Sequence, residues 1–414
     1  MRLIELTIKE FDDFATNHPL RNYCQSSAYA KFMGEMGFSY DYVGYEDESK
    51  TLVGASLILY KRIGTLAKYA YAPKGFLIDY YNVDLLQGFV KDITKKYKAR
   101  GVVFMKINPE IIIGELKANK SFAGEYNQNV KIIDDLKTLK FKRRRELEPL
   151  EFVMPRISPY LNLKTFNEDD LAPEAKSFIN YSKRKGLEIE VASPKEINYF
   201  YEFIKNTTSQ NINYFRNMFN VFSKSDMAEL LLVKVDYREF LVQARESYDL
   251  ELENNNNCNL KIQEDASEEN LNLKMASDKL LLQLKNNIVE ATDGLKKNPS
   301  QYVAGALIVK YLNRISIIAS GLDEKFATLY PLHFLHNQII ERFKSEYDYL
   351  DLNGLAADFS PNSRYFDANQ FKLGFNPAIY EFIGEFDYII DEGGFARLQS
   401  SDAITKEFKN QRLN

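Results

Sequence analysis

The first quarter of the chain alternates apolar and polar residues in a way that is typical of a mixed α/β layer. Runs rich in β-branched and apolar residues predict strands at residues 51–60, 66–72 and 101–107. Residues 84–100 place apolar side chains at helical spacing, and Gly101 follows them as a stop signal. Strand, helix, strand in this order indicates a βαβ-like unit.

A second α/β pattern occupies the later part of the chain. It begins with a predicted helix at 194–206, for which Ser193 is the expected N-cap. A strand at 228–235 follows, and we expect it to continue through 239–244. The remaining predicted elements are strands at 303–309 and 315–319, a helix at 332–346 and a strand at 348–352.

The region between these strands, residues 245–299, is polar and contains four consecutive asparagines. Its second half nevertheless carries apolar residues at steps of three and four: Leu273, Ala276, Leu280, Leu284, Ile288, Ala291 and Leu295. Such a stripe favours a helix packed on a partner, so we expect an antiparallel helical hairpin inserted between two strands of the second layer. The alternative is a disordered acidic loop, because asparagine is a poor helix former.

These patterns predict an α/β (α+β) fold built from two layers and an inserted hairpin. We expect the first subdomain to span residues 1–160 and the second to combine 161–242 with 303–395. Residues 243–302 form the hairpin, a coiled-coil arm. The length of 414 residues agrees with two or three domains.

Composition narrows the class of protein. The hydrophobic fraction of 45% and the charged fraction of 27% are those of an ordinary globular protein. A net charge of -4 argues against a surface uniformly coated for nucleic-acid binding. Two cysteines and three histidines are too few for a disulfide scaffold or a zinc site, and neither a signal peptide nor a membrane span is expected. We therefore expect a cytoplasmic protein without metal or cofactor.

Common catalytic motifs are missing from the sequence, which has no phosphate-binding P-loop, no HExxH and no GxSxG. His333 and His336 lie three residues apart in an apolar helix and are expected to pack rather than bind metal. Neither Cys24 nor Cys258 has a recognisable base partner. The basic run at 140–145 is either a phosphate contact or a solvated turn. Lys372 lies between apolar residues that suggest a strand or turn at a core edge.

The C-terminal segments 371–376 (FKLGFN) and 380–388 (YEFIGEFDY) resemble the closing signature of the Fem family (FemABX). Other segments are similar to family motifs and occur in the same order: 25–31 (QSSAYAK), 74–80 (KGFLIDY), 104–109 (FMKINP), 154–156 (MPR) and 304–307 (AGAL). The resemblance runs from about residue 20 to residue 390. Each piece is weak alone, but six in order, together with the inserted hairpin, are fairly specific.

This resemblance implies two acetyltransferase-like (GNAT-like) subdomains and an aminoacyltransferase. Fem enzymes build peptidoglycan interpeptide bridges by transferring an amino acid from aminoacyl-tRNA to the stem peptide of a lipid-linked or UDP-linked precursor. It also implies peripheral contact with the inner face of the membrane and a homo- or heterodimer with Fem-like proteins. Lysines like Lys31 and Lys372 lie at the phosphate-bearing end of the precursor in family members.

The resemblance also suggests other substrate-binding residues. We expect Tyr214 and Asn108 to line the acceptor channel, with Phe215 completing a family Tyr-Phe pair. The sequence departs from the family at two points. Asn108 stands where the family usually has aspartate, and an arginine that usually precedes the pair is absent, for which Arg216 is a nearby substitute. Asparagine cannot act as a base near neutral pH, so no catalytic base is assigned.

Two other functions remain open from the sequence. An acyl-CoA N-acyltransferase shares the sheet architecture, although its glycine-rich pyrophosphate turn is not found here. The other is a catalytically silent Fem-like binding or scaffold protein, which the departures at Asn108 and at the missing arginine suggest.

Overall fold

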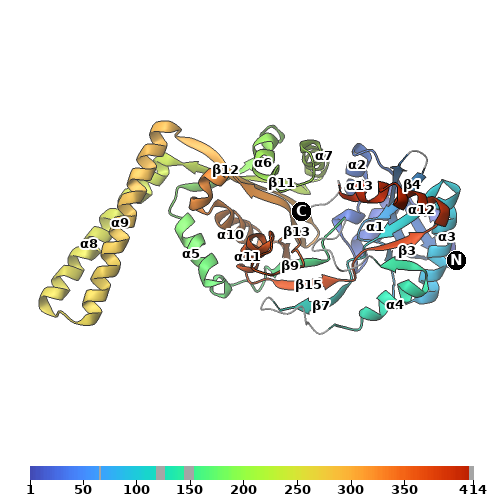
Figure 1. Ribbon diagram of the computed structural model, residues 1–414, viewed down its shortest axis with the longest axis horizontal. Coiled ribbons are helices and arrows are strands. Elements are labelled where there is room, and N and C mark those ends of the chain that lie inside the picture. Colours follow the sequence, from blue (N-terminus) through green and yellow to red (C-terminus); the bar gives the residue numbers. More distant parts are fainter. Residues whose placement is uncertain (65–66, 118–125, 144–152, 410–414) are drawn as a thin grey trace.

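The computed structural model describes residues 1–64, 67–117, 126–143 and 153–409. Two β-sheets follow one another along the long axis of the molecule, and a long helical arm extends from the end of the second (Figure 1). The structure confirms the expected fold class, with two α/β layers and a hairpin of helices inserted in the second.

The first sheet has the strand order β1-β2-β3-β4-β6-β16-β8, and β5 pairs with β3. β4 and β6 run parallel, and α3 leads directly into β6, which confirms the predicted strand–helix–strand unit. The strands are β1 (Arg2–Glu5), β2 (Ser39–Glu46), β3 (Leu52–Ile63), β4 (Ala67–Ala72), β5 (Leu77–Ile78), β6 (Val102–Ile107), β8 (Phe141–Arg143) and β16 (Phe386–Ile389). The helices packed on them are α1 (Ile8–Asn17), α2 (Ser27–Glu35), α3 (Val83–Ala99), α4 (Val130–Thr138), α12 (Glu392–Ser400) and α13 (Ala403–Lys409).

The second sheet has the order β10-β11-β12-β13-β14-β9-β15-β7. Its strands are β7 (Ile112–Leu116), β9 (Ile157–Asn162), β10 (Leu187–Ala192), β11 (Ala228–Asp236), β12 (Ser300–Tyr311), β13 (Arg314–Leu322), β14 (Tyr349–Asp351) and β15 (Ala378–Phe382). The helices of this half are α5 (Pro173–Ser182), α6 (Ile197–Ile204), α7 (Ile212–Ser223), α10 (Pro331–Phe343) and α11 (Phe366–Leu373). Short 3-10 turns complete the described elements: η1 (Tyr23–Gln25), η2 (Glu168–Asp170), η3 (Pro194–Glu196) and η4 (Glu324–Leu329).

Two strands cross between the halves. β7 precedes residue 160 in the chain yet pairs with β15 in the second sheet, whereas β16 pairs with β6 and β8 in the first. A buried ion pair fixes β16: the Lys106 ammonium on β6 lies 2.7 Å from the Asp387 carboxylate and 3.3 Å from that of Glu385. β7 and β16 therefore pair with the sheet of the other predicted subdomain. The subdomain boundaries themselves stay a prediction.

A common hydrophobic core joins the two halves. Helix α2 of the first half packs on helix α7 of the second, and the ring centroids of Phe32 and Tyr214 are 5.0 Å apart at nearly right angles. The same apolar cluster contains Leu57 of β3 and Leu230 of β11. Residues between the two sheets are thus held by packing from both sides.

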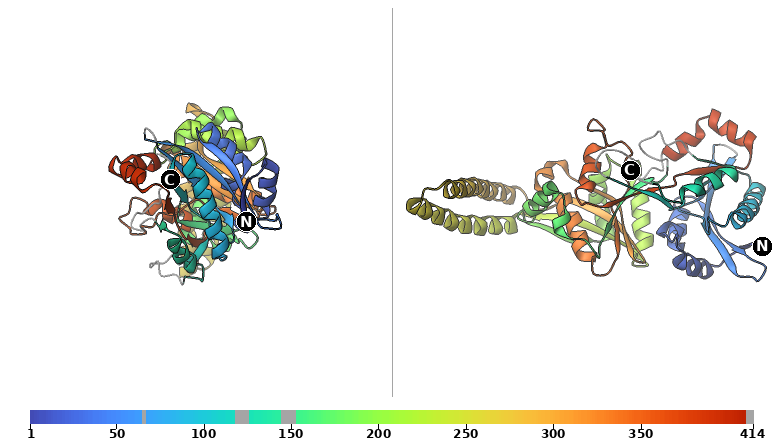
Figure 2. Two further views of the ribbon diagram at one scale, coloured as in Figure 1. Left: turned by 90° about the vertical axis from the view of Figure 1, so that its right-hand side faces the viewer. Right: turned by 90° about the horizontal axis from the view of Figure 1, so that it is seen from below.

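The arm consists of α8 (Tyr237–Glu264) and α9 (Glu268–Lys297), which run antiparallel away from the second sheet (Figure 2). The alternative of a disordered loop is therefore wrong. Asparagine is tolerated because it bonds across the seam: the buried Asn255 amide donates to Ser277 Oγ at 3.0 Å. At the base of the arm, the buried Lys185 ammonium donates to Asn287 and to Glu290, at 2.9 Å each.

Two local predictions were wrong. Residues 239–244 do not continue β11 but form the first turns of α8, because the Asp236 carboxylate caps the backbone N–H groups of Arg238 and Glu239. Lys372 does not lie on a strand or turn but in α11. Phe371 on α11 and Phe375, two residues beyond the end of that helix, both contact the ring of His336.

Candidate active site

The loop after β6 holds the tight turn at Lys74 and Gly75 in place. The buried Asn108 Oδ1 accepts hydrogen bonds from the Tyr71 hydroxyl at 3.1 Å and from the Lys74 backbone N–H at 2.9 Å. The turn has no room for a side chain at Gly75, because a Cβ there would lie 2.8 Å from Gln25 Nε2. Both lone pairs of the Asn108 oxygen are occupied, so this amide positions the turn that carries Lys74.

An ion pair connects this loop to the second sheet. The Glu110 carboxylate contacts the Arg314 guanidinium at the start of β13, and it also accepts from the Tyr160 hydroxyl at 2.9 Å and from the Asn22 amide. Burial alone would raise the pKa of Glu110, but Arg314 and Lys74 outweigh burial and hold that pKa below its ordinary value. Glu110 is therefore a fixed anion and a poor proton acceptor.

A second carboxylate, Asp351 at the end of β14, faces the same cations. Its Oδ1 accepts the Asn353 backbone N–H at 2.9 Å. Burial raises the pKa of Asp351, and Arg314 and Lys74 only partly counter that effect. Lys74, Glu110, Arg314, Asp351 and Lys372 together form what we call the charged centre.

Lys372 completes the charged centre from α11. Its ammonium donates to the Gly354 carbonyl at 2.7 Å, and burial lowers its pKa to about 8, although Asp351 opposes the shift. A lysine with this pKa exchanges a proton near neutral pH, unlike an exposed lysine.

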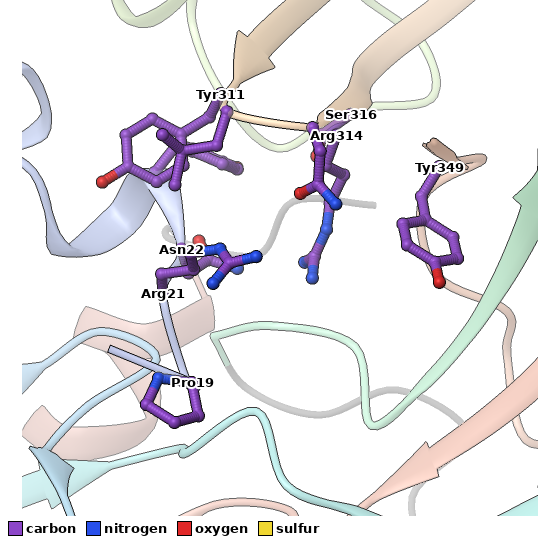
Figure 3. A pocket seen from close by; sticks show the side chains of 10 residues that line it. Pro19, Arg21, Asn22, Tyr311, Arg314, Ser316 and Tyr349 are labelled. Carbon is purple, nitrogen blue, oxygen red and sulfur yellow. The ribbon is translucent and has the colours of Figure 1, made fainter. Parts of the chain in front are cut away.

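Two cavities lie near η1, and Glu110 and Arg314 of the charged centre line the first of them. The arginine cavity consists of two adjoining parts, of about 390 and 120 Å³, which share Pro19, Arg21, Arg314 and Tyr349. Figure 3 shows that the side chains of Arg21 and Arg314 approach each other in the space between Tyr311 and Tyr349.

The methionine cavity, of about 240 Å³, lies between α2, α7 and α13. Its wall is largely apolar and aromatic, and a Lys61–Glu407 ion pair of 2.5 Å stands at its edge. The lining residues that define it are Tyr29, Met33, Met36, Phe38, Tyr71, Met154 and Tyr214.

The 3-10 turn η1 separates the two cavities. Tyr23 lines the arginine cavity, while Cys24 lies near enough to Tyr29 and Tyr214 to add to the rise in their pKa that burial causes. Burial also raises the pKa of Cys24 itself to about 12. This cysteine therefore stays a neutral thiol and does not serve as a nucleophile.

The family model for the FemAB family matches residues 6–400. The chain belongs to the FemAB family. Lipid II:glycine glycyltransferases of Staphylococcus epidermidis and Staphylococcus haemolyticus are 22% identical to this FemAB member over 413 residues, which is 95% of this chain and 94% of theirs. The protein of the same name from Staphylococcus aureus is also 22% identical, over 417 residues.

Solved structures agree on the fold. The crystal structure of FemX matches with a TM-score of 0.75 at 19% identity, covering 96% of this chain and all of FemX. A tandem GNAT protein from the clavulanic acid biosynthesis pathway matches with a TM-score of 0.50 at 8% identity, covering 94% and 98%. The two sheets of this FemAB member are thus GNAT-like layers, as expected.

The residues singled out from the sequence are not all found together. Lys31 is exposed on α2, two residues from Tyr29 and from Met33, both of which line the methionine cavity. Tyr214 lines that cavity directly, whereas its neighbour Phe215 is fully buried in the core. Among the described residues, Tyr214 is the only one of the six predicted site residues that lines the arginine cavity or the methionine cavity.

Arg216 remains a predicted substitute for the missing family arginine. Its guanidinium donates to Asn213 at 2.8 Å and to Asn198 at 3.2 Å on the surface. In the basic run, Arg143 Nε donates to the Ile383 carbonyl at 2.9 Å, while residues 144 and 145 lie outside the described residues. These arginines have local partners.

Sequence reasoning missed Arg21, Glu110, Arg314 and Asp351. Glu110 and Arg314 each precede an apolar segment, and that position was the available signal, whereas Arg21 and Asp351 carry no comparable signal. The described residues contain no group of three or more His, Cys, Asp or Glu side chains placed to hold a metal ion. They also include no helix with the length and apolar content needed to cross a bilayer.

Proposed function

We propose that this protein transfers an amino acid from aminoacyl-tRNA to the stem-peptide amine of a lipid II-type peptidoglycan precursor and so builds an interpeptide bridge. The observation that carries the proposal is the end-to-end similarity to lipid II:glycine glycyltransferases, 95% of this chain against 94% of theirs. The match covers both halves and the arm, so it is not limited to the GNAT-like layers.

The two cavities support a reaction with two substrates. They lie on opposite sides of η1, so an acceptor and a donor can be bound separately. We assign the acceptor to the methionine cavity, because Tyr214 lines it and Lys31 lies on the helix that forms its wall.

The role proposed for each predicted binding residue depends on which of its polar groups are not already bonded within the protein. Lys31 is exposed and can reach a phosphate group. Lys372 has donors left after its bond to Gly354, so it remains a proposed contact for the precursor's phosphate-bearing end. Asn108 keeps its proposed place beside the channel as the residue that positions Lys74. Phe215 packs against the Tyr214 ring, with ring centroids 5.3 Å apart, and Arg216 remains a proposed binding residue on the same helix.

The chemistry does not require a covalent intermediate. An aminoacyl ester is already activated, and aligning the amine with it can lower the barrier by roughly 7–11 kcal/mol. A proton must leave the attacking amine, and Asp351 is the carboxylate of the charged centre whose raised pKa suits that transfer. Glu110, held as an anion by Arg314, is less suited to it.

The substrate also suggests where the protein works. A lipid-linked acceptor would bring it to the inner face of the membrane as a peripheral protein, and pairing with itself or with another Fem-like protein would be compatible with that position. The arm is proposed to dock either the tRNA or such a partner protein.

The deciding experiment incubates purified protein with a panel of charged tRNAs and with lipid-linked and UDP-linked acceptors, and measures product mass. We expect one amino acid to be added to one acceptor. Absence of product in every combination would favour a silent binding protein instead. In the same assay Lys372→Ala should raise the KM for the precursor, and unchanged precursor binding in calorimetry would reject its role at the phosphates.

The role of the arm can be tested without disturbing its base. Removing residues 249–283 retains the contacts of Lys185 with Asn287 and Glu290. A raised KM for charged tRNA with an unchanged KM for the acceptor would support tRNA docking. Full retention of transfer would remove that role.

A further inference from the structure

A row of exposed apolar side chains runs along one face of α9. Met275, Leu282 and Val289 are seven residues apart, and they are 69%, 63% and 55% exposed. Leu271, one turn before Met275, is 45% exposed and extends the row. Residues spaced by four and by seven share one face of a helix. We call these four residues the outer stripe.

The outer stripe points away from α8. Met275, Leu282 and Val289 each lie two residues before a buried residue of α9, and one of these buried residues, Ser277, bonds to Asn255 of α8. Two residues turn a helix by about 200°, so the stripe and the contact with α8 lie on opposite faces. Because exposed apolar patches mark interaction sites, the stripe is a candidate docking surface of the arm.

Helix α8, which is described along its whole length, has no comparable row. Its most exposed apolar residues, Val242, Leu250 and Leu260, are eight and ten residues apart. The exposed carboxylates of Glu246 and Glu253 lie between them in the chain. The candidate docking surface is therefore the outer face of α9.

The charge of the arm disfavours RNA as the occupant of this surface. Residues 237–297 contain eight Lys or Arg and twelve Asp or Glu, so the arm has a net charge of -4. RNA is bound through surfaces with an excess of positive charge. An apolar stripe on an acidic helical arm instead suits the apolar face of another helix.

A second copy of α9 matches the charges of the first when the two helices run antiparallel. The first turn of α9 contains Glu268 and Glu269, and its last turn contains Lys296 and Lys297. Reversing one helix against the other places the acidic end of each copy beside the basic end of its partner.

The middle of α9 shows the same complementarity. The helix has 30 residues with Leu282 at its centre, and Asp278 and the exposed Lys285 lie on either side of Leu282. The bonds from Lys274 and Asn255 to Asp278 both use Oδ1, so Oδ2 can accept a further bond. An antiparallel copy brings Asp278 of each chain beside Lys285 of the other, whereas a parallel copy would oppose like charges.

We propose that the outer stripe binds the outer stripe of a second copy of this chain, with the two α9 helices antiparallel about a two-fold axis near Leu282. The inference deepens the proposed function and rests on it only for the docking role of the arm. An overlap of 30 residues is about 45 Å long and about 10 Å wide, so each copy buries about 450 Å². The total of about 900 Å² is below the roughly 1,200–2,000 Å² of a standard interface, so we expect a weak, reversible dimer.

Analytical ultracentrifugation of the full chain over a concentration series measures this association. Leu282→Glu places a charge near the two-fold axis in both copies and should weaken self-association at least about 10-fold. Leu250→Glu changes a leucine of α8 that is 70% exposed, and this control should associate like the unmodified protein. The proposal is overturned if the unmodified protein stays monomeric at every concentration, or if the two variants behave alike.

Cross-linking with a short bismaleimide tests the direction of pairing. The two native cysteines, Cys24 and Cys258, are buried, so the unmodified protein is a suitable background. Leu282→Cys should cross-link to itself. Met275→Cys and Val289→Cys should cross-link only when the two variants are mixed, because an antiparallel copy places one residue opposite the other. Cross-linked dimers of Met275→Cys alone, or no cross-linked dimer in any sample, would refute the antiparallel pair.

RNA docking is the competing outcome for the same variants. If Leu282→Glu raised the KM for charged tRNA while the unmodified protein stayed monomeric, the outer stripe would be an RNA site and the proposal would be overturned. Sedimentation and cross-linking use neither tRNA nor acceptor, so a dimer is detected even if no transfer occurs. Transfer by a protein that stays monomeric would leave the proposed function intact and remove this inference.

Discussion

The ion pair between Glu110 and Arg314 joins the loop after β6 to the second sheet, so its removal tests how firmly the two halves are held. Arg314→Met deletes the cation while keeping a flexible apolar side chain against Tyr160. The Glu110 side chain is 8% exposed and that of Arg314 is 27% exposed. The variant therefore leaves a nearly buried carboxylate without its cation.

The size of the effect follows from those exposures. Removing one partner of a buried ion pair destabilises a protein by about 3–5 kcal/mol. The partial exposure of Arg314 and the remaining bonds from Tyr160 and Asn22 to Glu110 reduce that figure. We expect the free energy of unfolding at pH 7 to fall by about 2–4 kcal/mol, a large part of the ~5–15 kcal/mol typical of a domain.

The effect should also depend on pH with a defined sign. The pKa of Glu110 is lowered in the folded protein from its ordinary value of 4.5. Its charge therefore stabilises the fold above that value, and the contribution is lost as the pH falls through the folded pKa. In Arg314→Met the largest influence that lowers this pKa is lost, so the folded pKa rises and protonation relieves the buried charge. The difference between the two proteins should shrink below about pH 4.5.

Guanidinium chloride unfolding at pH 7 and at pH 4 measures both quantities. Glu110→Gln and the double variant complete a double-mutant cycle. The double variant should recover part of the stability that Arg314→Met loses, because the buried Glu110 charge is then removed as well. A loss that is the same at both pH values, or no recovery in the double variant, would refute the assigned electrostatic coupling.

Three further changes test other parts of the structure. Lys106→Met should lower the free energy of unfolding by about 3–5 kcal/mol, because Glu385 and Asp387 lose their buried cation. The control Lys137→Met removes an exposed ion pair and should change the free energy of unfolding little in the same denaturation assay. Gly294→Ala places a Cβ 2.2 Å from the Tyr237 ring at the base of the arm and should cost about 1–3 kcal/mol, whereas Gly393→Ala on α12 meets nothing closer than 3.6 Å and should not. Asp351→Asn should lower kcat by about 10²–10⁴-fold with little change in either KM, and it should flatten the acidic limb of the pH profile. Asp348→Asn, just before the same strand, is its control. An unchanged kcat for Asp351→Asn would exclude the proposed base.

Local signals predicted most of the secondary structure. The apolar spacing of α3 and the Ser193 cap before α6 are properties of neighbouring residues, and both were confirmed. The stripe along α9 was confirmed only toward the base of the arm, where Leu284 and Ala291 are buried. Farther out, Leu273 and Ala276 are exposed and Ser277 is buried instead. Lys372 was misplaced because Phe371, Leu373 and Phe375 alternate with other residues, a pattern that favours a strand. The structure has a helix there that ends at Leu373.

The candidate site was harder to predict because its members come together only in three dimensions. Tyr214 was found through the resemblance of its motif. Glu110 and Arg314 are 204 residues apart in the chain, and nothing near either one indicates that it is paired and withdrawn from water. The sequence identified Asn108 as a departure from the family. That its side chain accepts hydrogen bonds from Tyr71 and Lys74 is seen only in the structure.

The position of β16 between β6 and β8 has a consequence for synthesis of the protein. The first sheet receives this strand from residues 386–389, close to the end of the chain. Until the ribosome has released them, β6 and β8 each present an unpaired edge, and the carboxylates that neutralise Lys106 are absent. The N-terminal half therefore cannot finish folding during translation ahead of the rest, and a fragment ending near residue 160 should expose two open strand edges and aggregate.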